Sequence, residues 1–200
     1  MKLEFHFDFG SPNAYLCHLL VPEVEARLNQ SIDYVPVLLG GVFKATNNVS
    51  PGVAMQGILN KPAYAAKETE RFLLAHGITR YESNPHFPVN TLMLMRGAIY
   101  AQQAGFFEHY VSEIYDHMWC QPKKMDDAAI FEAALTASDL PADAILSGIQ
   151  DAEVKATLIS NTESSVARGN FGSPTFFADD EMFFGKDKLR DFEEFVQSKR

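Results

Sequence analysis

The residues with the clearest chemical potential are Ser11 and Pro12, which stand between an alternating segment and an apolar one. Apolar and polar residues alternate over residues 3–9, as in a β-strand, and the residues after Pro12 are typical of a helix. At the start of a helix, a serine hydroxyl and unpaired backbone N–H groups stabilise an anion. The plain alternative is a serine that caps the helix, with proline at the first helical position. A Ser-His-Asp site is disfavoured, because Ser11 lies in no Gly-x-Ser-x-Gly turn and no motif places a base beside it.

A second motif lies far downstream, at Gly172-Ser173-Pro174-Thr175. It has the form of the cis-proline loop that faces the active-site helix of thioredoxin-like proteins, and cis peptide bonds are largely confined to X-Pro. Ser11-Pro12-Asn13-Ala14 then stands where such a protein carries its Cys-x-x-Cys. Because neither end of this segment is a cysteine, disulfide exchange within it is impossible. We therefore expect the protein to act through a thiol that another molecule supplies.

Four motifs, in this order, resemble the kappa-class glutathione transferases and, within that group, the bacterial 2-hydroxychromene-2-carboxylate isomerases. The motifs are Phe7–Pro12, Gly40–Asn48, Phe87–Leu92 and Phe183–Leu189. The resemblance covers nearly the whole chain, and four motifs in the right order are far more specific than any one of them.

The order of the expected elements predicts an α/β domain interrupted by an all-helical insertion, and the resemblance implies that this domain is thioredoxin-like. Strand patterns occupy residues 3–9, 32–37, 175–178 and 181–184, and helical patterns occupy residues 12–28, 61–76, 89–104, 106–118, 126–138, 151–168 and the segment from residue 186. Gly40-Gly41 and the cluster Asn47–Gly52 predict turns. The thioredoxin-like domain would comprise residues 1–45 and 170–200, and the helical insertion residues 46–169. The first strand is expected to have one covered face.

The resemblance implies glutathione as the cofactor and Ser11 as the catalytic residue. A free thiol has a pKa of about 8.5, and a hydroxyl that donates to the sulfur favours the thiolate. The implied glutathione-binding residues are Ser11, Asn48, Ser173, Pro174, Gly185, Lys186 and Asp187. The Ser173 backbone would pair with the cysteinyl part, and the Asp187 carboxylate with the γ-glutamyl ammonium. The family more often has an apolar residue at the Ser173 position, so a more polar local pocket is expected here.

The resemblance also implies a homodimer that isomerises 2-hydroxychromene-2-carboxylate in the degradation of aromatic compounds. Its substrate carries a carboxylate, for which Lys44 and Arg96 are the candidate binding residues. The segment Val49–Ala54, in contrast, has no basic group, which leaves the specific substrate open. One alternative is a kappa-class transferase or peroxidase that uses the same thiolate on an electrophile. The other is a redox-inactive thioredoxin-like protein that binds a partner peptide along its cis-proline edge.

Composition limits the partners and the compartment. A formal net charge of -9 at pH 7, without any run of Lys and Arg, disfavours nucleic acids and anionic membranes as partners. The N-terminal segment lacks the apolar region of a signal peptide, and no stretch has the ~18 apolar residues of a membrane span. Cys17 and Cys120 are isolated, which fits a reducing compartment. The sequence therefore predicts a cytoplasmic protein.

Three possible metal ligands, His109, Glu113 and His117, share one face of an expected helix. Their spacing differs from the His-Glu-x-x-His arrangement of zinc enzymes. Solvated side chains are the favoured interpretation, and the sequence predicts no metal site.

Overall fold

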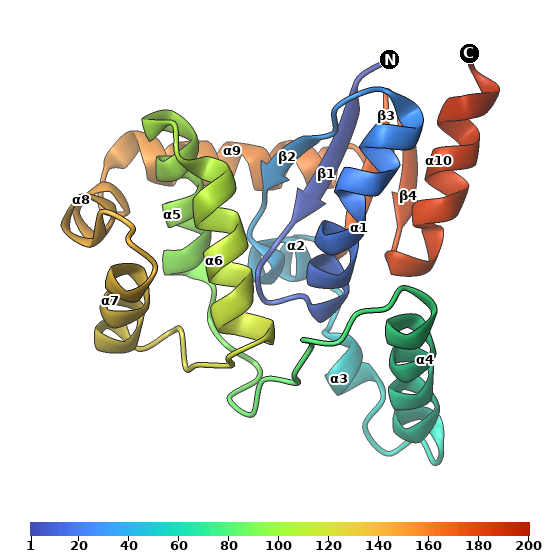
Figure 1. Ribbon diagram of the computed structural model, residues 1–200, viewed down its shortest axis with the longest axis horizontal. Helices are drawn as coiled ribbons and strands as arrows, with labels where there is room; N and C mark the ends of the chain where they lie inside the picture. Colours follow the sequence, from blue (N-terminus) through green and yellow to red (C-terminus); the bar gives the residue numbers. More distant parts are fainter.

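The computed structural model describes residues 1–200, and its centre is a mixed sheet of four strands in the order β2-β1-β3-β4. The strands are β1 (Leu3–Phe7), β2 (Asp33–Pro36), β3 (Thr175–Ala178) and β4 (Glu181–Phe184). β1 pairs in parallel with β2 and antiparallel with β3, and β3 pairs antiparallel with β4. The first and last parts of the chain thus form one sheet (Figure 1), which confirms the predicted α/β, thioredoxin-like fold.

Helices cover both faces of this sheet. α1 (Pro12–Leu28) and α10 (Leu189–Ser198) lie on one face, and α9 (Ala152–Ala167) crosses behind the strands (Figure 1). The side chains of β1 alternate between these two layers. Phe5 stacks on Phe176, which in turn contacts Phe192 of α10, whereas His6 bonds to Ser165 of α9.

The expectation that the first strand has one covered face is therefore wrong. Glu4, His6 and the following Asp8 are as buried as the phenylalanines between them. Their burial is possible because each polar side chain has a partner: Arg168 bonds to Glu4, Ser165 bonds to His6, and backbone N–H groups bond to Asp8.

Between β2 and β3 the chain forms helices joined by loops and no strand, as predicted. The helices are α2 (Leu39–Thr46), α3 (Pro51–Ala54), α4 (Lys61–Ala75), α5 (Leu92–Ala104), α6 (Phe107–Trp119), α7 (Ala128–Ala137), α8 (Ala142–Gly148) and α9. The sequence did not predict α2, α3 and α8, and the turn expected at Gly40-Gly41 is instead the first turn of α2. No helix combines the length and the apolar character that a membrane crossing needs.

One hydrophobic cluster of 39 buried residues spans the sheet and the helical segment. α6 contributes an apolar face to this cluster through Tyr110, Ile114 and Met118, which are fully buried. Gly97 of α5 permits the close approach of these two helices, because a Cβ there would lie 2.0 Å from the Tyr110 hydroxyl oxygen. At the end of α6, Trp119 Nε1 donates to the Phe9 carbonyl at 2.8 Å, which fixes the segment just before Ser11. The division into residues 1–45 with 170–200 and residues 46–169 stays a prediction.

Candidate functional site

The two motifs that the sequence singled out meet at the start of α1. Ser11 Oγ donates to the Ser173 carbonyl oxygen at 2.8 Å and accepts the Ala14 N–H at 3.2 Å, so the same hydroxyl caps the helix and contacts the opposite loop. The Ser173–Pro174 peptide bond is cis. The Asn13 N–H, in the first turn of α1, has no partner within the protein. The site therefore presents a hydroxyl, a free N–H and the positive end of a helix at one point.

The Asp8 carboxylate binds backbone N–H groups of the segments around Ser11. Its Oδ1 accepts the Gly10 N–H at 2.7 Å, and its Oδ2 accepts the Leu39 N–H at 2.7 Å. Burial raises the pKa of the Asp8 carboxyl, while these N–H groups and the Thr91 hydroxyl favour its ionised form. The side chain before α2, Leu38, makes no capping bond, so Asp8 supplies an acceptor to α2 from a distant strand. One carboxylate thus ties together the starts of α1, α2 and α5.

The side chain of Ser173 points into the protein. Its Oγ accepts the Asp8 N–H at 3.2 Å and is buried. The expectation that Ser173 makes the local pocket more polar is therefore wrong, because this hydroxyl is used to tie the proline loop to β1. The Ser173 carbonyl, and not its hydroxyl, faces Ser11.

The structure brings Gly185 beside the proline loop. Its N–H donates to the Pro174 carbonyl at 2.9 Å, and its φ of 98° lies in the region that favours glycine. Lys186 is buried: its ammonium pairs with the Asp187 carboxylate and lies 4.8 Å from the centre of the Phe72 ring in α4. The Asp187 side chain is 76% exposed. Of the two charged residues, Asp187 is thus accessible to a ligand, and Lys186 has its partners within the protein.

Asn48 contacts the segment that precedes the proline loop. Its Nδ2 donates to the Phe171 carbonyl at 2.8 Å, which joins the end of α2 to the segment before Ser173. The Phe171 ring contacts the Phe184 ring at 4.3 Å between centroids, and both residues are 38% exposed. This exposed aromatic pair could not be found from the sequence, because phenylalanines are normally assigned to the core.

Lys44 and Arg96, the two candidate substrate-binding residues, line the same cavity. It has a volume of about 510 Å³ and lies between α2, α5 and α9. Lys155 of α9 is a third cation in its wall, and none of the three forms an ion pair. Lys155 could not be found from the sequence, because it stands in no motif and looks like any polar residue of an amphipathic helix.

This cavity begins close to Asp8. Leu38 and Leu92 form part of its apolar wall, and they directly adjoin Leu39 and Thr91, which contact or face the Asp8 carboxylate. Glu163 is the acidic residue of the wall. An apolar wall with unpaired cations suits a ligand that has an apolar body and an anionic group.

The three possible metal ligands of α6 converge on one residue, Ser138. His109 Nε2 bonds to the Ser138 carbonyl, and His117 Nε2 and Glu113 Oε2 both bond to the Ser138 hydroxyl, at 2.8, 2.8 and 2.7 Å respectively. His117 is buried, so the expectation of a solvated face is wrong for this residue. The cluster joins the end of α7 to α6.

The chain is similar along nearly its whole length to named enzymes. It is 24% identical over 196 residues to the 2-hydroxychromene-2-carboxylate isomerase of Sphingobium xenophagum, covering 97% of both chains. It is 25% identical over 200 residues to glutathione S-transferase kappa 1 of Rattus norvegicus, covering 94% of this chain and 87% of that protein.

Among solved structures, a 2-hydroxychromene-2-carboxylate isomerase superposes with a TM-score of 0.83 at 22% identity, over 99% of this chain and 95% of the other. The family model of the DSBA-like thioredoxin domain matches residues 2–197. By this match over nearly all of its length, the chain belongs to the family of DSBA-like thioredoxin domains.

Proposed function

We propose that the protein is a glutathione-dependent isomerase of the 2-hydroxychromene-2-carboxylate type. The observation that carries the proposal is the contact between Ser11 Oγ and the Ser173 carbonyl at the start of α1, in a thioredoxin-like site without cysteine. Both cysteines of the chain, Cys17 and Cys120, are free. A site of this kind can bind a thiol but cannot exchange a disulfide of its own. The relatives named as isomerases support the assignment.

The groups around Ser11 fit glutathione. The Ser11 hydroxyl and the unpaired Asn13 N–H are donors suited to a thiolate sulfur, and the Ser173 carbonyl is an acceptor suited to the cysteinyl N–H. The exposed Asp187 carboxylate suits the γ-glutamyl ammonium. A serine hydroxyl has one hydrogen to donate. Ser11 therefore releases the Ser173 carbonyl to the cysteinyl N–H when it turns its hydrogen to the sulfur.

Glutathione, held by Ser11, the Ser173 carbonyl and Asp187, would supply a thiolate as the nucleophile for reversible addition to the conjugated double bond of the ring-opened substrate. Ser11 and the positive end of α1 stabilise the anionic sulfur. Lys44 and Arg96 hold the substrate carboxylate, and Lys155 adds to the positive potential of the cavity wall. Leu38 and Leu92 contact the aromatic ring and exclude water from it.

The second candidate is a kappa-class transferase, because the relatives include two glutathione S-transferases kappa 1. The same residues would stabilise the thiolate, and the sulfur would stay on the product. Analysis of the product distinguishes the two activities: an isomerase returns free glutathione, and a transferase consumes it. In either case we propose an enzyme of aromatic-compound metabolism in the reducing cytoplasm, acting as a homodimer.

Glutathione binding tests the proposal directly. At ~100 times its dissociation constant, glutathione should stabilise the protein by about 2.7 kcal/mol. For a chain of this length, the melting temperature should rise by roughly 5 to 10 °C. S-methylglutathione, which cannot form a thiolate, should bind more weakly. Absence of any shift at millimolar glutathione would leave only the peptide-binding alternative.

Ser11→Ala distinguishes a thiolate-stabilising residue from a plain helix cap. The thiolate absorbance of bound glutathione near ~240 nm should titrate below the free-thiol pKa of about 8.5 in the wild type and at higher pH in Ser11→Ala. Turnover should fall in parallel. Asp127→Ala is the matched control, because Asp127 caps α7 through the Ala129 and Ile130 N–H groups, far from the site. It should lower the stability and leave the thiol pKa unchanged.

A further inference from the structure

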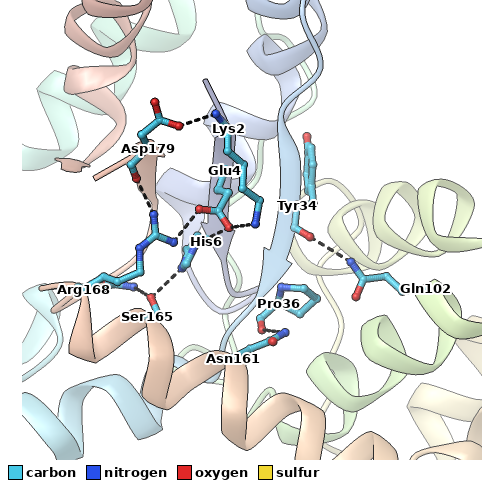
Figure 2. A network of polar contacts seen from close by, with 11 residues as sticks. Lys2, Glu4, His6, Tyr34, Pro36, Gln102, Asn161, Ser165, Arg168 and Asp179 are labelled. Atoms are coloured by element: carbon cyan, nitrogen blue, oxygen red, sulfur yellow. Dashed lines mark hydrogen bonds and ion pairs between the residues drawn. The ribbon is translucent and has the colours of Figure 1, made fainter. Parts of the chain in front are cut away.

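A chain of buried polar residues runs from the outer end of β1 to the proline loop, on the sheet face that α9 covers. Its members are Glu4, His6, Ser165 and Asn170, all buried. Figure 2 shows its outer part, where His6 lies between Ser165 and the ion-paired Glu4. None of the four is part of the site described above, and buried polar groups are costly unless they are fully paired.

Asn170 bridges the proline loop. Its Oδ1 accepts the Gly172 N–H at 2.8 Å and lies 2.9 Å from the Thr175 hydroxyl oxygen, whose one hydrogen it shares with the Gly172 carbonyl, also at 2.9 Å. Asn170 therefore contacts the residues on both sides of Ser173-Pro174. Because a backbone N–H can only donate, Oδ1 must face Gly172. The Nδ2 group must then face Ser165 Oγ, to which it donates at 2.7 Å.

This orientation fixes the direction of the next hydrogen bond. Ser165 Oγ accepts from Asn170, and the only acceptor that its own hydrogen can reach is His6 Nδ1 at 2.7 Å. The Ser165 hydrogen is therefore donated to His6 Nδ1. Nδ1 must be unprotonated to accept it, and the ring hydrogen must lie on Nε2. Burial lowers the pKa of His6 to about 4, so the ring is neutral at neutral pH.

The outer end of the chain is anchored by charge. His6 Nε2 has no hydrogen-bond partner and lies 4.0 Å from Glu4 Oε1, towards which its N–H dipole can point. Glu4 is held by Lys2 at 2.7 Å and by Arg168 at 2.6 Å. Each group in the chain, from the Gly172 N–H to the His6 ring, donates a hydrogen to the next group. The chain ends at the Glu4 carboxylate, towards which the His6 Nε2–H is directed.

We propose that Asn170 is a positioning residue for glutathione, held in its orientation by Ser165 and His6. It fixes the Gly172–Thr175 loop so that the Ser173 carbonyl faces Ser11 at 2.8 Å, which is the backbone acceptor that the cysteinyl part of glutathione needs. The inference rests on the proposed function for its ligand. The direction of the hydrogen bonds in the chain is independent of that function, because it follows from contacts within the protein.

NMR of the unliganded wild type tests the direction of the chain. The His6 ring should be the Nε2–H tautomer at pH 7, with Nδ1 as an acceptor. In Asn170→Asp, a carboxylate oxygen replaces Nδ2, the Ser165 hydrogen turns to it, and His6 Nδ1 should become protonated. Asn29→Asp is the control, because it adds the same charge at the exposed end of α1. A wild-type ring protonated on Nδ1 overturns the inference, whatever the protein binds.

Binding measurements test the positioning role. Asn170→Ala removes both loop contacts and should raise the dissociation constant of glutathione about tenfold, as expected for lost buried hydrogen bonds. The pKa of the bound thiol should not change, because Ser11 and α1 remain. Asn170→Asp keeps the acceptor for Gly172 and should restore most of the affinity. Unchanged affinity in Asn170→Ala, or a thiol pKa that shifts with it, contradicts positioning of the backbone.

A second variant, at Thr175, and the behaviour of the wild type separate the remaining outcomes. If Asn170→Ala does not fold, Thr175→Val keeps the side-chain shape and removes the hydroxyl that contacts both Asn170 and the Gly172 carbonyl, and it should weaken binding about threefold. Unchanged affinity in that variant would overturn the role. If the wild type binds no glutathione, the proposed function fails, and the inference about the ligand fails with it, but the Nε2–H tautomer of His6 is still required.

Discussion

At the scale of single residues, Asp187 and its neighbour Lys186 differ in how accessible their charged groups are to a ligand. Lys186 is buried against Phe72, and its ammonium is directed to the Asp187 carboxylate, whose side chain is largely exposed. The lysine therefore fixes the carboxylate in place. A ligand ammonium can approach the exposed side of the same carboxylate, which gives these adjacent residues different tasks.

Asp187→Asn should therefore weaken glutathione binding by roughly 1.5 to 3 kcal/mol, as expected for loss of a hydrogen-bonded charge partner. Calorimetric titration of folded protein measures this. Asp180→Asn is a matched control, since Asp180 lies exposed in the turn between β3 and β4 and forms no ion pair. Equal affinity of the two variants would show that the γ-glutamyl end binds elsewhere.

The three cations of the cavity between α2, α5 and α9 should act on the second substrate and not on glutathione. Lys44→Ala, Arg96→Gln and Lys155→Ala should each raise KM for a chromene carboxylate about fivefold to tenfold, because each removes part of the charge that faces its carboxylate. The dissociation constant of glutathione should stay the same. Lys67→Ala, on the exposed face of α4, is the control. The KM for a neutral substrate analogue should be the same in the wild type and in all of these variants.

Residue spacing in the sequence was sufficient to single out Ser11, Pro174 and Gly185 as candidate site residues, because short motifs carry them. Asp8, Ser165 and Asn170 could not be assigned in the same way. Their partners lie on other elements, and a polar residue in a strand or helix pattern is ordinarily assigned to solvent. Only the packing of helices and loops against the sheet shows that these positions are buried.

At the scale of elements, α2 shows how a distant side chain overrides a local signal. Gly40-Gly41 predicts a turn, and glycine disfavours a helix interior. The helix forms nevertheless, because Asp8 accepts the Leu39 N–H of its first turn, and Gly41 packs closely on Thr162 of α9. The residue that stabilises the start of α2 is thus thirty-one positions away in the chain.

Asp8→Asn should consequently cost more stability than the loss of a local helix cap. The amide NH2 group must face either the Gly10 or the Leu39 N–H, which leaves one buried donor without an acceptor and costs about 1 to 3 kcal/mol. Asp127→Ala, which removes the exposed cap of α7, should cost about 1 kcal/mol. Urea denaturation of both variants provides the comparison. A smaller loss in Asp8→Asn than in Asp127→Ala would show that the carboxylate does not hold α2.

At the scale of the whole molecule, the fold class followed from the order of strand and helix patterns, and the arrangement of the helices did not. Sequence pattern shows that a helix has an apolar face, but it does not show which surface covers that face. α9 is the clearest case. It lies behind the sheet, where Ser165 bonds to His6 and Arg168, at the end of α9, bonds to Glu4, so the polar side chains of β1 are buried and paired.

Histidine burial makes the stability of the whole molecule depend on pH. Burial lowers the pKa of His6 and of His18 to about 4, and His18 Nδ1 bonds to the Tyr34 hydroxyl at 2.8 Å. In the unfolded chain both rings bind a proton near pH 6.5. Between these values the unfolded state binds more protons, so the stability is fully present above pH 6.5 and is lost as the pH falls towards 4. The raised pKa of Asp8 acts in the opposite sense.

The last prediction is that the protein is markedly less stable at pH 5 than at pH 7. Each of His6 and His18 should contribute a loss of about 2 kcal/mol at pH 5, and together they should lower the melting temperature by roughly 10 °C. In His18→Gln, which cannot titrate, the difference between the two pH values should shrink by about 2 kcal/mol, the share of His18. His86→Gln, at an exposed position, should keep the full difference. Equal pH dependence of the wild type and His18→Gln would mean that His18 is protonated in the folded protein, contrary to its buried contact with Tyr34.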